Sequence, residues 1–408
     1  MTFQVGRRQF LQVGAGAASV LSLSGPIPRL LQAAASGGRA DGRILVVVEM
    51  AGGNDGLNTV VPFANDEYRK ARPTLAIPAD RVLKLSGELG LHPSMRGFAD
   101  LFDQGRLAVV QGVGYPQPNR SHFESMDIWH TCLRKDVSRP EGWIGRFLDE
   151  QAARSGGDPP AMHFGADKQP FALMSRDVRV PSIRSLDEFR IDGFEQDRFR
   201  SAVRDLAETR RASDNDLLSF VQSSSAAALA TSERIEAAAG GKQTAREWPA
   251  SPLGQKLQTV ARLITTGLQT CVYYVQLDGF DTHARQAAAH EGLLKQLSDA
   301  VSVFLEEMAS SGDGERVAVL CFSEFGRRVE ENASEGTDHG TAAPVFIAGA
   351  AVKGGLIGGH PSLSQLEDGD LKFHTDFRQV YAAVLERWMN CDSRRILQGQ
   401  FSPSPIFV

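Results

Sequence analysis

The sequence predicts a single α/β domain built on a doubly wound, mainly parallel sheet that is flanked by helices. Long apolar runs end in glycine-rich or polar turns, and amphipathic stretches separate these runs. Fully apolar strands are typical of parallel sheets covered on both faces, and their alternation with helices is typical of doubly wound folds. A chain of 408 residues is long enough to bury the core of such a domain.

Five apolar runs are the expected strands. The first, RILVVVEM at residues 43–50, leads into the turn AGGNDGLN. Three other runs have a polar or glycine-rich exit, whereas the fifth has its polar loop in front of it. These four are residues 107–114, 271–279, 316–326 and 343–352. Ligands of doubly wound proteins bind at the carboxyl ends of the strands, so the polar loops are expected to converge there.

The expected helices follow from apolar residues at spacings of three and four. They are residues 92–105, 123–133, 290–312 and 377–389. Residues 185–250 are charged, alanine-rich and poor in strand signals, which predicts a helical insertion. There is no internal repeat, so we expect one domain over residues 42–408.

Composition excludes several classes of partner and site. The net charge of −5 gives no electrostatic reason to expect nucleic acid or an anionic membrane surface as a partner. The four cysteines are far apart and form no CxxC motif, which argues against a zinc–cysteine site. Cys271 and Cys321 lie in apolar runs and are expected to be buried free thiols.

The N-terminus resembles a twin-arginine signal peptide. Arg7 and Arg8 precede a weakly apolar stretch, and QAAAS offers a cleavage site after Ala35. The stretch is too short to span a bilayer, and no other segment is long enough. We therefore expect residues 1–35 to be removed, the twin-arginine machinery to be an export partner, and the mature protein to be periplasmic or secreted without an integral membrane segment.

The turn after the first strand offers Asn54, Asp55 and Asn58 as site residues. Gly52 and Gly53 would let the backbone turn sharply or approach a ligand closely. The same sequence, NDG, is also an ordinary turn signal, so a purely structural interpretation stays open.

The segment PNRSHFES places Ser121 and His122 at the start of an expected helix. Ser121 with Glu124 three residues later has the spacing of a capping box, which is a structural role. The functional interpretation uses the same position, because the amide groups of a helix N-terminus favour an anionic substrate. Arg120 would add charge-assisted hydrogen bonds to a phosphate or sulfate.

Three further loops carry acidic and histidine side chains at predicted strand ends. Carboxylates and imidazoles gathered at one sheet edge are the ligands of a divalent-metal hydrolase. The residues in these loops are Asp278, Asp281, His283, Glu324, Arg327, Asp338 and His339.

Several long motifs resemble one exported bacterial family, called domain of unknown function 1501. They are GGNDGLNTVVP, NRSHFES, GFDTHARQ, SEFGRRVEENASEGTDHGTAAPVFIAG and DFRQVYAAVLERWM, in order along nearly the whole mature chain. That family is similar to the alkaline phosphatase and sulfatase superfamily, which implies a doubly wound sheet with metals at the strand ends.

The resemblance to the superfamily also implies individual roles. His339 matches its last metal-binding segment, Glu324 stands for an aspartate ligand, and Phe325 replaces a histidine ligand. Asp281 and His283 lie where the superfamily has an Asp and a His, although only two residues apart here. The first-strand ligand would be Asp55 or Glu49. Because Phe325 replaces a histidine ligand, one metal ion or an altered site is a safer inference than a full two-metal site.

The leading hypothesis is an exported, metal-dependent hydrolase of phosphate or sulfate esters, on a small-molecule or glycan substrate. Ser121 would be the nucleophile with His122 beside it, and Asn54, Arg120 and Arg327 would bind the substrate. The expected ion is Zn²⁺ or Mn²⁺, because nitrogen and oxygen ligands suit these metals better than Ca²⁺. The alternative is a non-catalytic binding or assembly protein with a degraded metal site. The expected metal ligands are Asp55, Asp281, His283, Glu324, Asp338 and His339.

Overall fold

A computed structural model describes residues 42–151, 158–165, 168–184 and 246–408. The expected signal peptide and residues 185–245 of the expected insertion lie outside these ranges. The described residues belong to one compact unit. Within the described ranges, no helix combines the length and apolar character needed to cross a membrane.

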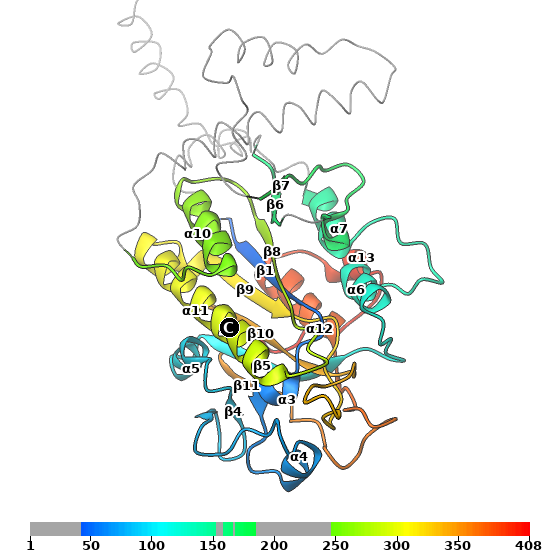
Figure 1. The fold of residues 1–408 in the computed structure, drawn as a ribbon. Helices are drawn as coiled ribbons and strands as arrows, with labels where there is room; N and C mark the ends of the chain where they lie inside the picture. The colour runs from blue at the N-terminus through cyan, green and yellow to red at the C-terminus, as the bar shows by residue number, and fades with distance from the viewer. Residues whose placement is uncertain (1–41, 152–157, 166–167, 185–245) are drawn as a thin grey trace, which may run out of the picture. The chain divides into compact units, whose positions relative to one another are not determined.

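The core of the fold is a mixed, mostly parallel sheet, as the sequence predicted (Figure 1). Its order is β11-β5-β10-β9-β1-β8-β6-β7, and β12 also pairs with β5. The strands are β1 (Ile44–Ala51), β5 (Leu107–Gly114), β6 (Ala161–Phe164), β7 (Ser182–Ile183), β8 (Val272–Asp278), β9 (Val317–Phe322), β10 (Ala343–Gly349), β11 (Gly355–Ile357) and β12 (Thr375–Asp376).

Strand β10 runs against its neighbours, and this reversal matters for the site. It pairs antiparallel with both β9 and β5, whereas β1 pairs parallel with both β8 and β9. The amino end of β10 therefore lies at the same sheet edge as the carboxyl ends of β1, β8 and β9. The polar loop before β10 consequently joins the loops that follow those three strands.

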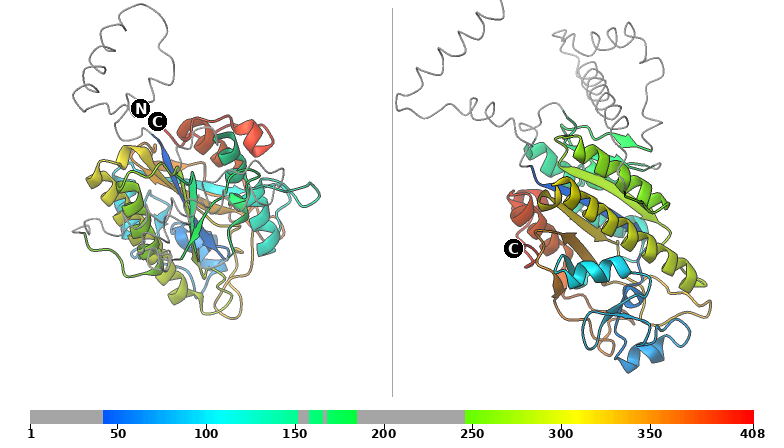
Figure 2. Two further views of the ribbon diagram at one scale, coloured as in Figure 1. Left: turned by 90° about the horizontal axis from the view of Figure 1, so that it is seen from above. Right: turned by 90° about the vertical axis from the view of Figure 1, so that its left-hand side faces the viewer.

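Helices cover both faces of the sheet (Figures 1 and 2). The apolar cluster on one face includes side chains of α5, α10 and α11, and the cluster on the other includes side chains of α6, α7, α12 and α13. These helices are α5 (Arg96–Asp103), α6 (His122–Thr131), α7 (Trp143–Gln151), α10 (Pro252–Thr265), α11 (Gln286–Ser311), α12 (Phe377–Ala383) and α13 (Ser393–Leu397).

The burial of β1 explains why its sequence is apolar throughout. Seven of its eight residues are buried, because β8 and β9 pair with its two edges and helices cover both faces. Among the described helices, α11 is the longest at 26 residues, and it stops at Gly312, whose φ of 82° is the left-handed conformation common after helix ends.

The five predicted strands and the four predicted helices are all present, with shifted ends. The last helix differs in detail, since α12 continues into a π-helical turn at Val384–Trp388. The elements that were not predicted are strands β6, β7, β11 and β12 and helices α7, α10 and α13. Also not predicted are a small sheet of β2 (Val60–Val61), β3 (Leu83–Lys84) and β4 (Gly90–Leu91), helices α3 (Gly56–Thr59) and α4 (Asp66–Ala71), and 3₁₀ turns at Phe171–Leu173 and Gly314–Arg316. All four cysteines are free thiols, with Cys321 buried and Cys271 half-buried.

Candidate metal centre

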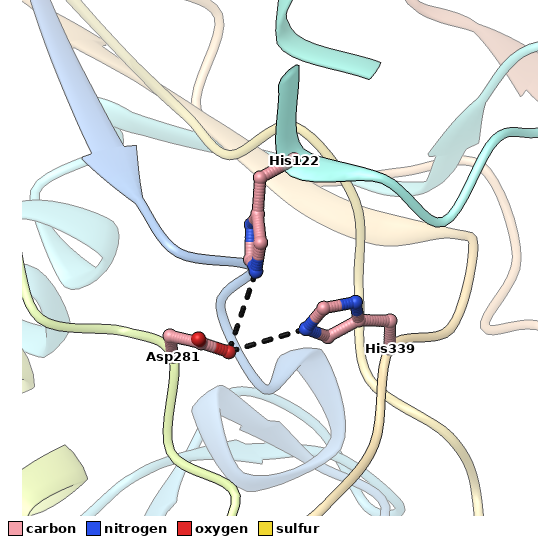
Figure 3. Close-up of side chains that lie close together, drawn as sticks. All are labelled: His122, Asp281 and His339. Carbon is pink, nitrogen blue, oxygen red and sulfur yellow. Dashed lines mark hydrogen bonds and ion pairs between the residues drawn. The ribbon is translucent and has the colours of Figure 1, made fainter. Parts of the chain in front are cut away.

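Three histidines and one aspartate converge at the sheet edge where the loops meet. Figure 3 shows His122, Asp281 and His339 directed toward one another, and their nearest ligand atoms all lie within 4.8 Å of one another. The Oδ1 atom of Asp281 is 3.4 Å from Nε2 of His122 and 3.2 Å from Nε2 of His339. His283 joins them, with its Nε2 3.0 Å from the same oxygen.

Each of the three imidazoles is fixed through its other nitrogen, Nδ1. That atom is 2.7 Å from Glu324 Oε1 in His122, 3.1 Å from Asp338 Oδ1 in His283, and 2.8 Å from the Arg120 carbonyl oxygen in His339. Ionised carboxylates and carbonyls only accept hydrogen bonds, so Nδ1 must carry the proton in all three rings. The neutral rings then direct the lone pair of Nε2 into the cluster.

This arrangement favours a bound cation. Nε2 of His283 lies 2.9 Å from Nε2 of His339, and both face the Asp281 carboxylate. Two lone pairs and a carboxylate at such distances repel one another unless a proton or a metal ion lies between them. Imidazoles whose Nδ1–H groups donate to oxygens are also the usual form of histidine metal ligands. The residues present therefore fit a divalent ion.

The buried Arg327 ties the loops around the cluster together. Its Nε donates to the Gly53 carbonyl at 2.7 Å, and its terminal nitrogens donate to the carbonyls of Gly52, Phe280 and Thr337. One of these nitrogens also lies 2.7 Å from Asp281 Oδ1. A single guanidinium thus joins the loops after β1 and β8 to the loop before β10.

The glycines after β1 are required by close approach of the backbone to the site. Gly52 and Gly53 have φ of 116° and 76°, values that favour glycine. A Cβ at Gly52 would lie 2.5 Å from the Asp281 amide nitrogen, and one at Gly53 would lie 2.3 Å from the Phe325 ring. The expectation of a sharp turn is confirmed, and the close approach seen is to Asp281 and Phe325 of the chain itself.

Phe325 packs against the ligand rings instead of binding a metal. Its ring centroid is 4.9 Å from those of both His122 and His339. It is 2% exposed, so it holds the two imidazoles in place from the protein interior.

The electrostatics keep the carboxylates of the cluster charged. Burial alone would raise the pKa of Asp281, but the hydrogen bond from Arg327, the contact with His339 and the nearby positive charge lower it to about 2. Hydrogen bonds from Asn332 and His283 lower the pKa of Asp338. The hydrogen bond to Glu324 raises the pKa of His122, because the carboxylate favours the protonated ring.

A cavity of about 690 Å³ opens beside the cluster. His122, Asp281 and Glu324 contribute to its wall, so a molecule in the cavity would reach the cluster directly. The wall also includes exposed apolar side chains, of which Phe123 is 87% exposed. The volume suits a small organic ligand.

Two predicted site residues in the loop after β1 are directed away from the cluster. Asp55 was expected to bind metal, but it is fully buried in an ion pair with Arg72 and accepts a hydrogen bond from Gln286. Asn54 was expected to contact substrate, but it is fully buried and its side-chain oxygen pairs with Thr59 and His290. Both side chains stabilise the loop from inside, because buried polar groups need partners.

The two arginines predicted to bind substrate are also committed to protein contacts. Arg327 is 2% exposed, and its donors are used by the loops described above. Arg120 forms an ion pair with the buried Asp370, and 39% of its side chain remains exposed. Its carbonyl, which the sequence analysis did not consider, orients His339.

The other predicted residues lie at the cluster in distinct positions. Glu324 and Asp338 contact histidine Nδ1 atoms, so they position ligands and are not among the converging ligand atoms. His122, predicted to assist the nucleophile, lies among those ligand atoms.

Ser121 is exposed at the N-cap position of α6, but its side chain makes no capping hydrogen bond. The expected capping box is wrong, because Glu124 pairs with Arg139.

The structure also reveals a polar network that the sequence analysis missed. Glu49 is buried and contacts His130, Tyr274 and Gln276. The sequence signal that could have indicated this network was a lone acidic residue, Glu49, within the apolar run of β1. The analysis considered Glu49 only as a metal ligand, and the network lies apart from the converging ligand atoms.

Comparisons with known proteins give the family. The chain belongs to the family described as Protein of unknown function (DUF1501), whose model matches residues 43–399. No match was found among curated proteins.

Solved structures with a related arrangement share little sequence with this chain. The lipoteichoic acid synthase LtaP from Listeria monocytogenes has 9% identity and a TM-score of 0.43, over 90% of this chain and 77% of that one. The C-terminal periplasmic domain of EcEptC from Escherichia coli, in complex with Zn, has 9% identity and a TM-score of 0.36, over 76% and 74% of the two chains. The PsFucS1 sulfatase from Pseudoalteromonas sp. has 10% identity and a TM-score of 0.37, over 92% and 72%. At these values the likeness carries no inference about activity.

The geometry predicts how substitutions will change metal binding. His122→Ala and His339→Ala should each abolish stoichiometric Zn²⁺ binding, because each removes one of the converging nitrogens. Glu324→Gln should weaken the affinity by about 10- to 100-fold, since it alters only the group that positions His122. Competition with a chromogenic chelator measures these affinities. His360→Ala, in a loop outside the cluster, is the matched control and should bind like wild type. Unchanged affinity in both alanine variants of the cluster would contradict the assignment.

Proposed function

We propose that this member of the DUF1501 family is an exported, metal-dependent hydrolase of phosphate or sulfate esters. The observation that carries the proposal is the convergence of three Nε2 atoms on Asp281, with every Nδ1 held by an oxygen. Such a set is built for a cation, and it lies on the wall of a cavity large enough for a small organic substrate.

The ion would be held by His122, His283, His339 and Asp281. Nitrogen and oxygen ligands of this kind suit Zn²⁺ or Mn²⁺. A bound divalent ion supplies positive charge that polarises an ester oxygen and favours the deprotonated form of a nearby hydroxyl. Arg327 adds a fixed positive charge next to Asp281. This supports a centre with one ion, because the guanidinium already neutralises part of the carboxylate charge.

The start of α6 is suited to hold the anionic part of an ester. Helix N-termini present unpaired amide groups and the positive end of the helix dipole. The Ser121 side chain does not cap these amides, so they stay available to substrate oxygens. The next residue is His122, which places the helix start beside the cluster.

Ser121 is our candidate nucleophile. Its side chain is exposed, makes no capping hydrogen bond, and adjoins both His122 and Arg120. In the reaction, Oγ would form a bond to phosphorus or sulfur as the ester oxygen leaves with the alcohol. The serine proton would pass to solvent, the alcohol would take one up, and water would then release the anion from the serine. Arg120 would contribute positive charge at the rim of the site.

Two observations favour a second candidate, a non-catalytic binding protein. Phe325 occupies the position implied for a histidine ligand, and Asp55 is bound to Arg72 instead of to the cluster. A centre reduced in this way could hold an ion for binding an anionic ligand without turnover.

Substitution of Ser121 separates the two candidates. With stoichiometric Zn²⁺ or Mn²⁺ present, wild type should hydrolyse an aryl phosphate or aryl sulfate. Ser121→Ala should lower turnover by a factor of about 10³ or more, as expected for loss of a nucleophile. Its stability should change by less than about 0.5 kcal/mol, because no capping bond is lost. Ser121→Thr keeps a hydroxyl and should retain part of the activity. Metal-loaded wild type that hydrolyses no ester in a broad panel would favour the binding protein.

Export by the twin-arginine pathway is part of the proposal. It rests on Arg7 and Arg8, the weakly apolar stretch after them, and the cleavage sequence ending at Ala35. Changing both arginines to lysine should retain the protein in the cytoplasm, since the receptor reads the arginine pair. Fractionation of expressing cells measures this, and normal export of the lysine variant would refute it.

A further inference from the structure

The wall of the cavity contains the candidate metal centre and, at some distance from it, a second group of polar side chains around Glu49 and His130. One face of α6 lines it through His122, Met126 and His130, which are four residues apart. Eight residues of α-helix span about 12 Å along the axis. His122 belongs to the metal centre, so the wall reaches from that centre to a region around His130.

A buried carboxylate forms this inner end. The Glu49 side chain is 3% exposed and contributes to the cavity wall. Its Oε2 accepts a hydrogen bond from the Tyr274 hydroxyl and lies 3.0 Å from His130 Nε2. Its Oε1 accepts a hydrogen bond from Gln276 at 2.9 Å. The network thus joins β1, β8 and α6, which fixes the position of the carboxylate.

Glu49 pairs with His130 but has no permanently charged partner, and one of its oxygens has room for another donor. Burial alone would raise the pKa of Glu49, but contacts with His130, Tyr274 and Gln276 lower it. In the described part of the chain, no arginine or lysine forms an ion pair with it. A carboxylate offers about four acceptor positions, and Oε1 has a single donor here. Oε1 can therefore accept a further hydrogen bond from a cation, in addition to the pairing of Oε2 with His130, which is charged only when protonated.

The walls between the two ends are largely apolar. Met126, Pro170, Phe171 and the exposed side chains of Phe123 and Met174 contribute apolar surface to the wall, and Lys168 and Asp278 are among its polar residues. Such walls suit a hydrocarbon or aromatic linker. The cavity therefore matches a molecule with an anionic ester at one end, an apolar middle and a cation at the other end.

We propose that Glu49 forms a subsite for a substrate ammonium group, so that the substrate is an ester of an amino alcohol with a long apolar linker. The inference rests on the proposed function for the ester end only. The ammonium group would donate hydrogen bonds to Glu49 Oε1 while the ester lies against the metal centre. A charge-assisted bond of this kind also gives selectivity over uncharged esters of the same length.

The test compares matched ligands that are not hydrolysed. Aminooctylphosphonate should bind the Zn²⁺-loaded protein about tenfold more tightly than octylphosphonate in calorimetry, as expected for one charge-assisted bond. Glu49→Gln should remove this preference and leave octylphosphonate binding unchanged. Gln276→Lys, which places a cation beside an intact Glu49, should do the same. Asp127→Asn changes another acid of the cavity wall and should keep the preference.

A second ligand pair keeps the subsite testable apart from the ester site. In metal-free protein, octylammonium should bind more tightly than octanol, and Glu49→Gln should abolish the difference. If phosphonates bind without an amine preference, the subsite is refuted while the proposed function stands. If phosphonates fail to bind but octylammonium binds through Glu49, the ester proposal fails and the subsite stands. Equal binding of octylammonium and octanol to wild type would overturn the subsite. That result would indicate that His130 alone is the cation that pairs with Glu49.

Discussion

The guanidinium of Arg327 is the contact on which the geometry of the site depends. It is buried, and it donates to backbone carbonyls from the loops after β1 and β8 and before β10. These loops come from distant parts of the sequence. The guanidinium also donates a hydrogen bond to Asp281. It therefore links these loops to the centre of the candidate metal site. Loss of Arg327 would leave several buried carbonyls unpaired, which is costly.

The orientation of the histidines gives the site its chemical character. Glu324, Asp338 and the Arg120 carbonyl each hold one Nδ1–H, and the three Nε2 atoms then face one carboxylate. The three carboxylates of the centre, including Asp281, outweigh the one buried guanidinium by two charges when the imidazoles are neutral. A divalent ion would balance this difference. Phe325 supports the rings, and the arrangement as a whole favours one ion over two.

Much of the fold could be predicted because its strands are buried on both faces and carry a strong apolar signal. The reversed strand β10 was visible in the sequence as a run whose polar loop comes first, and that order explains how His339 meets His283. The short strands β7, β11 and β12 were missed, since two or three residues carry no periodicity.

The site was harder to predict, because sequence shows which residue types are present but not the direction of each side chain. Asp55 and Asn54 occupy a loop at the site edge and are nevertheless directed inward, where Asp55 pairs with Arg72 and Asn54 with His290. Glu324 and Asp338 were expected to bind metal, but their carboxylates contact the Nδ1 atoms of His122 and His283. Glu49 was noticed as an acid within an apolar strand, but its partners come from β8 and from the far end of α6. Only the folded arrangement brings these groups together.

The most direct test of this account is X-ray absorption spectroscopy of the protein loaded with one equivalent of Zn²⁺. The account predicts a first shell dominated by imidazole nitrogen, with three histidines and one carboxylate oxygen at about 2.0–2.2 Å. The outer-shell scattering typical of imidazole rings should be present and should decrease in the His283→Ala variant. A shell of oxygen atoms alone, without imidazole scattering, would contradict the assignment of this cluster as a metal centre.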